Sequence, residues 1–183
     1  MFRTRNNLSD ILSGLRIERF GLKTQPGDSM ATVKQKTVVN YKMKGTSVSH
    51  ARADVTVRDV KLTTDEPVER GGTNLAFSPT ETLMGALVGC TNNIALKIAH
   101  HHGVEMEITG IEADVRFDRR GVLLEEDVAV PFPEVHLTIN VRTDASDRDI
   151  DEIRTDLGKF CPVAKVLREA GTKITETWNV ERA

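Results

Sequence analysis

The 183-residue sequence is poor in the features that mark several large classes of protein. Aromatic residues make up only 4% of the chain, too few for the stacking platforms on which proteins bind single-stranded nucleic acid. The net charge is −2, so no basic excess predicts binding to nucleic acid or to an anionic membrane. No apolar run approaches the ~18 residues of a membrane span, and the N-terminus lacks the apolar core of a secretion signal. We therefore expect a cytoplasmic globular protein that binds neither nucleic acid nor membrane.

Cysteine is also scarce, since only Cys90 and Cys161 are present. In a reducing compartment a permanent structural disulfide is unusual, so the two thiols are either inert core residues or a reactive pair. Free cysteine is among the most buried residue types, and burial alone can explain a single cysteine. The sequence around each thiol therefore has to separate these two interpretations.

The longest predicted helix runs from Ser78 to Gly103 and contains Cys90. Ser78 is a favoured N-cap, Pro79 suits the first helical position, and Glu81 completes a capping box. Apolar residues then recur at helical spacing, with Cys90 in the middle of the apolar face. Gly103 suits the position just after the helix, so both ends of this element are marked in the sequence.

Two glycines within this helix favour contact with a second copy of the chain. Gly85 and Gly89 lie one turn apart, and each costs about 1 kcal/mol in a helix interior. Together they leave a smooth groove on the helix surface, and close approach of another helix is a reason to tolerate them. We expect a homodimer that packs through this helix.

Alternation of apolar and polar residues predicts strands on both sides of the helix. Before the helix we expect three strands, at residues 33–43, 47–51 and 53–62, with a turn at Gly45. After it we expect three more strands, then two helices and a last strand; these strands are at residues 104–108, 111–118, 135–142 and 172–180. The order βββ-α-βββ-αα-β is an α+β two-layer sandwich of antiparallel sheets and helices. We assign residues 1–31 to an N-terminal appendage or linker and residues 32–183 to one domain.

The two cysteines have different predicted surroundings. Cys161 precedes Pro162 and so falls at the N-cap of a short helix, where the dipole and the unpaired amides favour a thiolate. Cys90 lies about nine residues into its helix, beyond the reach of the dipole. If Cys90 is the attacking thiolate, another group must stabilise it, and an arginine is the natural choice because it stays charged.

Glu81 has two candidate roles. As a capping-box residue it contributes, with Ser78, on the order of 1 kcal/mol to helix stability. As a functional residue it would hold an arginine near the thiol. Nine residues at ~100° each place Glu81 on roughly the opposite face from Cys90 and ~13 Å away. Either the helix bends near Gly85 or Gly89, or Glu81 serves a site that a second chain completes.

The sequence gives little support for a metal or phosphate site. His100, His101 and His102 are consecutive, so their side chains point ~100° apart on a helix and cannot converge on one ion. Gly71 and Gly72 lack the lysine and the strand–helix context of a phosphate-binding loop. From these residues we expect neither a metal site nor a phosphate-binding loop.

Two motifs, in this order of elements, together resemble those of the OsmC/Ohr family. The first is the pair Gly71-Gly72 followed by SPTETLMGALVGC, which ends at Cys90, and the second is CPVAK, which begins at Cys161. The resemblance covers roughly residues 33–182. It implies an OsmC/Ohr-like fold, built as an intertwined homodimer with two active sites at the subunit interface and needing no metal, flavin or haem.

The resemblance also implies a function, that of a thiol peroxidase acting on organic hydroperoxides. By motif, Cys90 matches the peroxidatic cysteine and Cys161 the resolving cysteine. The Cys90 thiolate would attack the distal peroxide oxygen and become a sulfenic acid, with which Cys161 would condense to a disulfide. An external dithiol, a lipoyl group in the Ohr branch, would then reduce the disulfide.

The chain departs from the family pattern at the arginine and its acid. Active peroxidases of the family often read Asn-Pro-Glu before the helix, and that acid bridges an arginine. Here the triplet is Ser78-Pro79-Thr80, and the acid is the next residue, Glu81. Arg70 is the first candidate for the arginine and Arg58 is the second. The sequence thus resembles a divergent branch of the family.

Two alternatives to a peroxidase remain open on the same fold. The first is a non-catalytic protein that binds a small molecule or lipid. The second is a redox sensor whose Cys90–Cys161 disulfide alters partner binding through residues 1–31.

Overall fold

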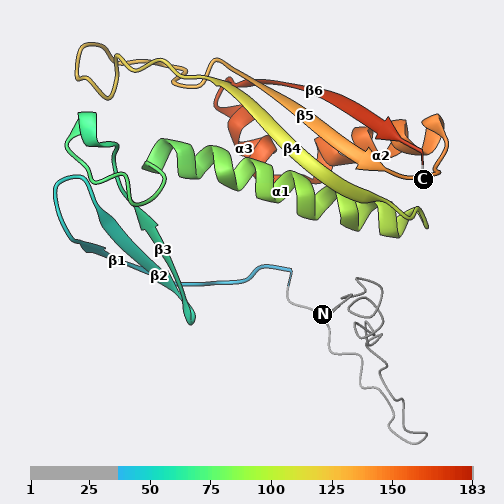
Figure 1. Ribbon diagram of the computed structural model, residues 1–183, viewed down its shortest axis with the longest axis horizontal. Helices are drawn as coiled ribbons and strands as arrows, with labels where there is room; N and C mark the ends of the chain where they lie inside the picture. Colours follow the sequence, from blue (N-terminus) through green and yellow to red (C-terminus); the bar gives the residue numbers. More distant parts are fainter. Residues whose placement is uncertain (1–36, 183) are drawn as a thin grey trace, which may run out of the picture. The chain divides into compact units, whose positions relative to one another are not determined.

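The computed structural model describes residues 37–182, and the chain divides into two units, Met1–Asn40 and Tyr41–Ala183. The helices and strands reported below all belong to the second unit (Figure 1). The predicted boundary between residues 31 and 32 lies outside the described residues, as does the appendage assigned to residues 1–31.

The first sheet is an antiparallel meander in the order β1-β2-β3. Its strands are β1 (Met43–Ser47), β2 (Ala53–Val57) and β3 (Val60–Thr64). Three strands before the long helix are confirmed, but their predicted boundaries are wrong. The stretch 53–62 is a hairpin and not one bulged strand, because Arg58 adopts a left-handed φ of 53° and turns the chain. Gly45 lies within β1, opposite Val55, and not in a turn.

The second sheet has the order β4-β5-β6. Its strands are β4 (Glu107–Arg116), β5 (Glu134–Arg142) and β6 (Lys173–Glu181). Two strands, and not the three predicted, separate the long helix from the next one, because a register shift between Ile108 and Gly110 lets β4 continue as a single strand. The expectation of antiparallel sheets throughout is also wrong. β5 and β6 are parallel, since two helices carry the chain back before β6 begins.

The long helix α1 (Pro79–His101) has the ends that the sequence predicts. The Ser78 hydroxyl accepts a hydrogen bond from the Glu81 amide, and the Glu81 carboxylate accepts one from the Ser78 amide at 2.8 Å. Gly103 adopts a left-handed φ of 72° just after the helix. Both the capping box and the glycine stop are therefore confirmed, and α1 runs along the β4–β6 sheet as one straight helix (Figure 1).

Two shorter helices, α2 (Asp147–Phe160) and α3 (Pro162–Glu169), pack against α1. They contribute to one core with the inward face of β5, whose alternating residues are all buried; these are Val135, Leu137, Ile139 and Val141. The α+β class is confirmed, with two three-stranded sheets and three α-helices in residues 37–182. No helix in this part of the chain is long and apolar enough to cross a bilayer.

Candidate functional site

The two cysteines meet where α1 crosses the junction of α2 and α3. Cys90 lies in α1 and is half-buried, whereas Cys161 is only 1% exposed. Their sulfur atoms are 3.1 Å apart, and the Cys161 thiol donates a hydrogen bond to Cys90 Sγ. Both thiols are reduced. A disulfide has an S–S length of about 2.05 Å, so an approach of about 1 Å separates the two sulfurs from a bond.

The backbone fixes Cys161 from both sides. Its amide donates to the carbonyl of Leu157 and closes α2, while its carbonyl accepts from the amide of Lys165 in α3. Its sulfur also accepts from the amide of Ala164 at 3.5 Å, so the thiol acts as the N-cap of α3, as its position before Pro162 predicts. The resolving position proposed by the sequence is thus held by two helix ends.

The protonation state of Cys161 differs from the expectation. Burial raises the pKa of its thiol to about 11; the Ala164 amide opposes this rise, and the neighbouring Cys90 sulfur adds to it. The helix N-terminus does not produce a thiolate here, because desolvation outweighs the amide contacts. Cys161 is therefore an S–H donor at neutral pH, and its hydrogen bond is directed to Cys90 Sγ.

Arg70 and Glu81 lie away from the cysteine pair: Arg70 ends the short helix η2 (Val68–Arg70), and Glu81 is in the first turn of α1. Both line a cavity of about 380 Å³, whose other walls are largely apolar and include Phe77, Met84, Val88, Val115, Phe117 and Phe132. Cys90 is not among its lining residues. Because α1 continues unbroken through Gly85 and Gly89, no bend brings Glu81 around to the thiol (Figure 1). Within one chain, the structure brings the two cysteines together but brings neither Arg70 nor Glu81 to them.

Both charged residues of this cavity already have partners. The backbone amide of Ser78 is the main cause, and its hydroxyl the second, of a lowered pKa at Glu81; the positive charge of Arg70 contributes less. Arg70 donates its Nε–H to Glu66 Oε2 at 2.6 Å. The other candidate arginine, Arg58, is exposed at the β2–β3 turn and does not line the cavity.

Sequence reasoning missed two residues next to this site, Asp65 and Glu66. Asp65 is 1% exposed, and its carboxylate accepts hydrogen bonds from the amides of Glu66, Thr73 and Leu75. Glu66 holds Arg70 as described above. The spacing of four residues between Glu66 and Arg70 was the available signal for the ion pair.

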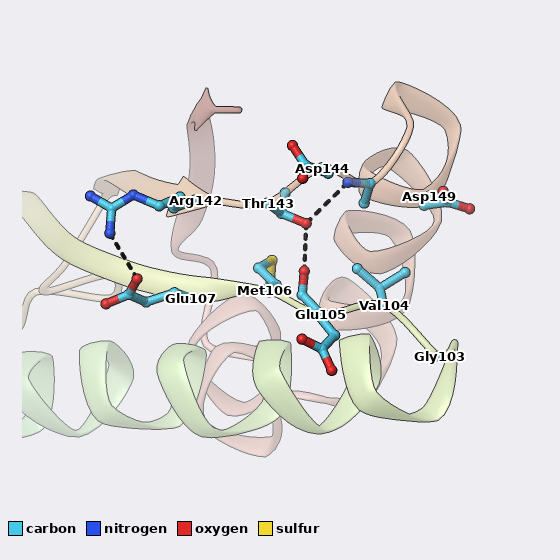
Figure 2. Close-up of a pocket in the computed structure, with 10 residues that line it drawn as sticks. Gly103, Val104, Glu105, Met106, Glu107, Arg142, Thr143, Asp144 and Asp149 are labelled. Carbon is cyan, nitrogen blue, oxygen red and sulfur yellow. Dashed lines mark hydrogen bonds and ion pairs between the residues drawn. The ribbon is translucent and has the colours of Figure 1, made fainter. Parts of the chain in front are cut away.

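The histidines and a second cavity carry no obvious chemistry. His102 Nε2 contacts Asp156 Oδ2 at 3.1 Å, and no cluster of metal ligands occurs among the described residues. A cavity of about 570 Å³ lies between the end of α1, the start of β4 and the end of β5, and its lining residues are drawn in Figure 2. There Arg142 pairs with Glu107 at 2.9 Å and the Thr143 hydroxyl donates to the Glu105 carbonyl at 2.6 Å, so the polar groups join neighbouring strands.

Together these observations define a small α+β protein with a close cysteine pair between a long helix and a helix junction. The family model described as OsmC-like protein matches residues 72–177. The chain belongs to the OsmC-like protein family.

Solved structures share the fold at low sequence identity. An OsmC-like protein from Mycoplasma pneumoniae is 15% identical with a TM-score of 0.65, and the match covers 78% of this chain and 97% of that one. An organic hydroperoxide resistance protein OsmC from Legionella pneumophila is 14% identical with a TM-score of 0.57, covering 79% and 100%. An organic hydroperoxide resistance protein from Elizabethkingia anophelis is 15% identical with a TM-score of 0.54, covering 81% and 100%. Comparison with curated protein sequences gave no match.

Proposed function

We propose that this protein is a cysteine-based peroxidase that reduces organic hydroperoxides, with Cys90 as the peroxidatic and Cys161 as the resolving cysteine. The observation that carries the proposal is the 3.1 Å approach of two reduced sulfurs, one half-buried and one fully buried. Membership of the OsmC-like family supports it, as do the structural neighbours named organic hydroperoxide resistance proteins.

The bonds that form and break belong to the hydroperoxide, these two sulfurs and an external reductant. The Cys90 thiolate attacks the distal oxygen of the hydroperoxide, the O–O bond breaks, and the alkoxide leaves as an alcohol after gaining a proton. Cys90 is then a sulfenic acid. The Cys161 sulfur displaces its hydroxyl, which leaves as water with the proton of Cys161, and an S–S bond forms. A dithiol of the lipoyl type then reduces the disulfide and is itself oxidised.

A second copy of the chain completes the site in this proposal. Arg70 lines a cavity with Glu81, on the face of α1 away from Cys90, so the arginine of one subunit would stabilise the thiolate in Cys90 of the partner subunit. Exposed apolar side chains near this cavity support such an interface; Phe77 is 65% exposed and Leu75 is 61% exposed. The proposed assembly is a homodimer with two shared sites.

A pair of serine variants tests the assignment of the cysteines. We expect Cys90→Ser to abolish hydroperoxide consumption with a dithiol as reductant. Cys161→Ser should permit one oxidation that stops at a sulfenic acid on Cys90, which dimedone traps as a mass adduct. Full activity of Cys90→Ser would show that the mechanism is wrong.

A second candidate function is the binding of a small apolar molecule or lipid. The largely apolar cavity of about 380 Å³, with Arg70 and Glu81 among its lining residues, supports it. A binding protein with both cysteines intact would show no hydroperoxide turnover, whereas the peroxidase turns over only while both are present.

A further inference from the structure

The segment between β3 and α1 is fixed from inside by one carboxylate. The buried side chain of Asp65 accepts the amides of Glu66 at 3.0 Å, Thr73 at 3.0 Å and Leu75 at 3.1 Å, together with the Thr73 hydroxyl. The Thr73 hydroxyl, followed by the Leu75 amide, lowers the pKa of Asp65. Asp65 also donates its own amide to the Phe77 carbonyl at 3.0 Å. One ionised side chain thus ties both ends of the segment together.

Backbone contacts close the same segment over Glu66. A side chain at Gly72 would place its Cβ 1.7 Å from the Glu66 carbonyl oxygen, so only glycine fits. The Asn74 amide donates to that carbonyl at 3.1 Å, and Gly71, with a φ of 84°, ends the short helix η2 (Val68–Arg70). These backbone contacts therefore fix the conformation of the segment that carries Arg70.

Within residues 37–182, the guanidinium of Arg70 is held at one nitrogen only. Its Nε donates to Glu66 Oε2 at 2.6 Å, and the two side chains are only 33% and 29% exposed. Among the residues that the structure describes, neither terminal nitrogen of Arg70 donates to a protein acceptor, so both NH₂ groups remain available. Glu81, which lines the same cavity as Arg70, accepts the Ser78 amide at 2.8 Å and forms no ion pair with Arg70.

We propose that Glu66 is the positioning residue for Arg70 and that the segment fixed by Asp65 and Gly72 presents the arginine as a preformed fork. Glu66 fixes the plane of the guanidinium through Nε, which leaves both NH₂ groups to face an anionic sulfur or peroxide oxygen. The proposal rests on the proposed function, in which Arg70 stabilises the thiolate in Cys90 of the partner subunit. In this proposal Glu81 caps α1, and Glu66 is the acid that orients the arginine.

The first test measures the orientation of Arg70 without any activity. The Nε–H of Arg70 gives a nitrogen–proton NMR signal, assigned by its loss in Arg70→Lys. We expect Glu66→Gln to accelerate solvent exchange of this proton on the order of tenfold, because it removes a charge-assisted hydrogen bond. Glu69→Gln is the matched control, since it removes the same charge from a residue next to Arg70 that forms no ion pair with it, and it should leave the signal unchanged. A larger effect from Glu81→Gln than from Glu66→Gln would overturn the proposal.

The second test measures the effect on the thiol in the full-length protein. Glu66→Gln should lower kcat/KM for cumene hydroperoxide on the order of tenfold and move the acid limb of its pH profile upward, because the thiolate is less stabilised. In an Arg70→Lys background the same change should have no further effect, since Glu66 acts through Arg70. An equal loss in both backgrounds would show that Glu66 has a merely structural role and would overturn the proposal.

The two tests separate this proposal from the proposed function. If the wild-type protein consumes no hydroperoxide while Glu66→Gln alone alters the Arg70 signal, the peroxidase proposal fails and the assignment of Glu66 stands. If hydroperoxide is consumed and the Arg70 signal is the same in Glu66→Gln as in the wild type, the assignment of Glu66 fails and the peroxidase proposal stands.

Discussion

Cys161 is 1% exposed, and this burial raises the pKa of its thiol to about 11. The thiol therefore keeps its proton at neutral pH and donates it toward Cys90 Sγ. In the proposed reaction, the difference in exposure between Cys90 and Cys161 sets the order in which the two sulfurs react. Cys90 reacts first as the better exposed sulfur, and Cys161 loses its proton only when that proton can leave with the hydroxyl of the sulfenic acid as water.

The raised pKa of Cys161 predicts a loss of stability in alkaline solution. The ordinary value is 9.0 and the folded value is about 11, so between these limits the unfolded chain releases a proton that the folded chain keeps. Stability is therefore fully present below pH 9 and falls as the pH rises towards 11. Thermal unfolding of the reduced protein should show this fall, and Cys161→Ser should weaken it. An equal fall in both proteins would show that Cys161 is not the titrating group.

Sequence reasoning identified the two cysteines but misjudged the state of one. The helix N-terminus at Cys161 is a local signal and was visible, whereas burial at the junction of three helices depends on tertiary packing and was not. Asp65 was missed for the same reason, because its hydrogen bonds to Thr73 and Leu75 exist only once the segment closes. The role of a single residue was predictable where it depends on its neighbours in the sequence, and not where it depends on tertiary packing.

The segment between β3 and α1 owes its shape to one glycine in particular. Gly72→Ala would place a methyl group against the Glu66 carbonyl oxygen, which the backbone cannot avoid without moving. We expect a loss of stability on the order of 2 kcal/mol, together with loss of the Arg70–Glu66 ion pair. Urea unfolding measures the first effect and the Arg70 NMR signal measures the second.

Gly45 provides the control for this substitution. It lies in β1 with no atom within 4 Å of an added Cβ, so Gly45→Ala should change stability little or raise it slightly. Similar destabilisation of both variants would mean that Gly72 is not specifically required.

The elements differ in how far the sequence determined them. The ends of α1 were predicted correctly because Ser78, Glu81 and Gly103 are local signals. The β2–β3 hairpin was missed because its turn, at Arg58, contains no glycine or asparagine to mark it. The parallel pairing of β5 with β6 was missed because it depends on how α2 and α3 return the chain, which no alternation of residues encodes.

The residues of the proposed site are divided between two faces of α1, so neither face alone carries a complete site. One face carries Cys90 beside Cys161, and the other lines the cavity that contains Arg70 and Glu81. In the proposed homodimer each thiol receives its arginine from the partner subunit. The family model and the fold match support the family, while the shared site is an inference from the opposite placement of these residues.

Subunit complementation tests the shared site. Cys90→Ser and Arg70→Ala should each be inactive or strongly impaired, but a 1:1 mixture after subunit exchange should recover about a quarter of wild-type activity. Half of the dimers are then mixed, and each mixed dimer has one intact site of two. If both residues serve the same subunit, no mixed dimer has an intact site, and the mixture recovers nothing.

The central claim is that Cys90 and Cys161 form a reactive pair, and intact mass tests it most directly. One equivalent of cumene hydroperoxide is added to the fully reduced protein, and the mass is measured after seconds. We predict a loss of two hydrogens that maps to a Cys90–Cys161 disulfide. An unchanged mass after minutes would contradict the account and leave two inert thiols in a shared fold.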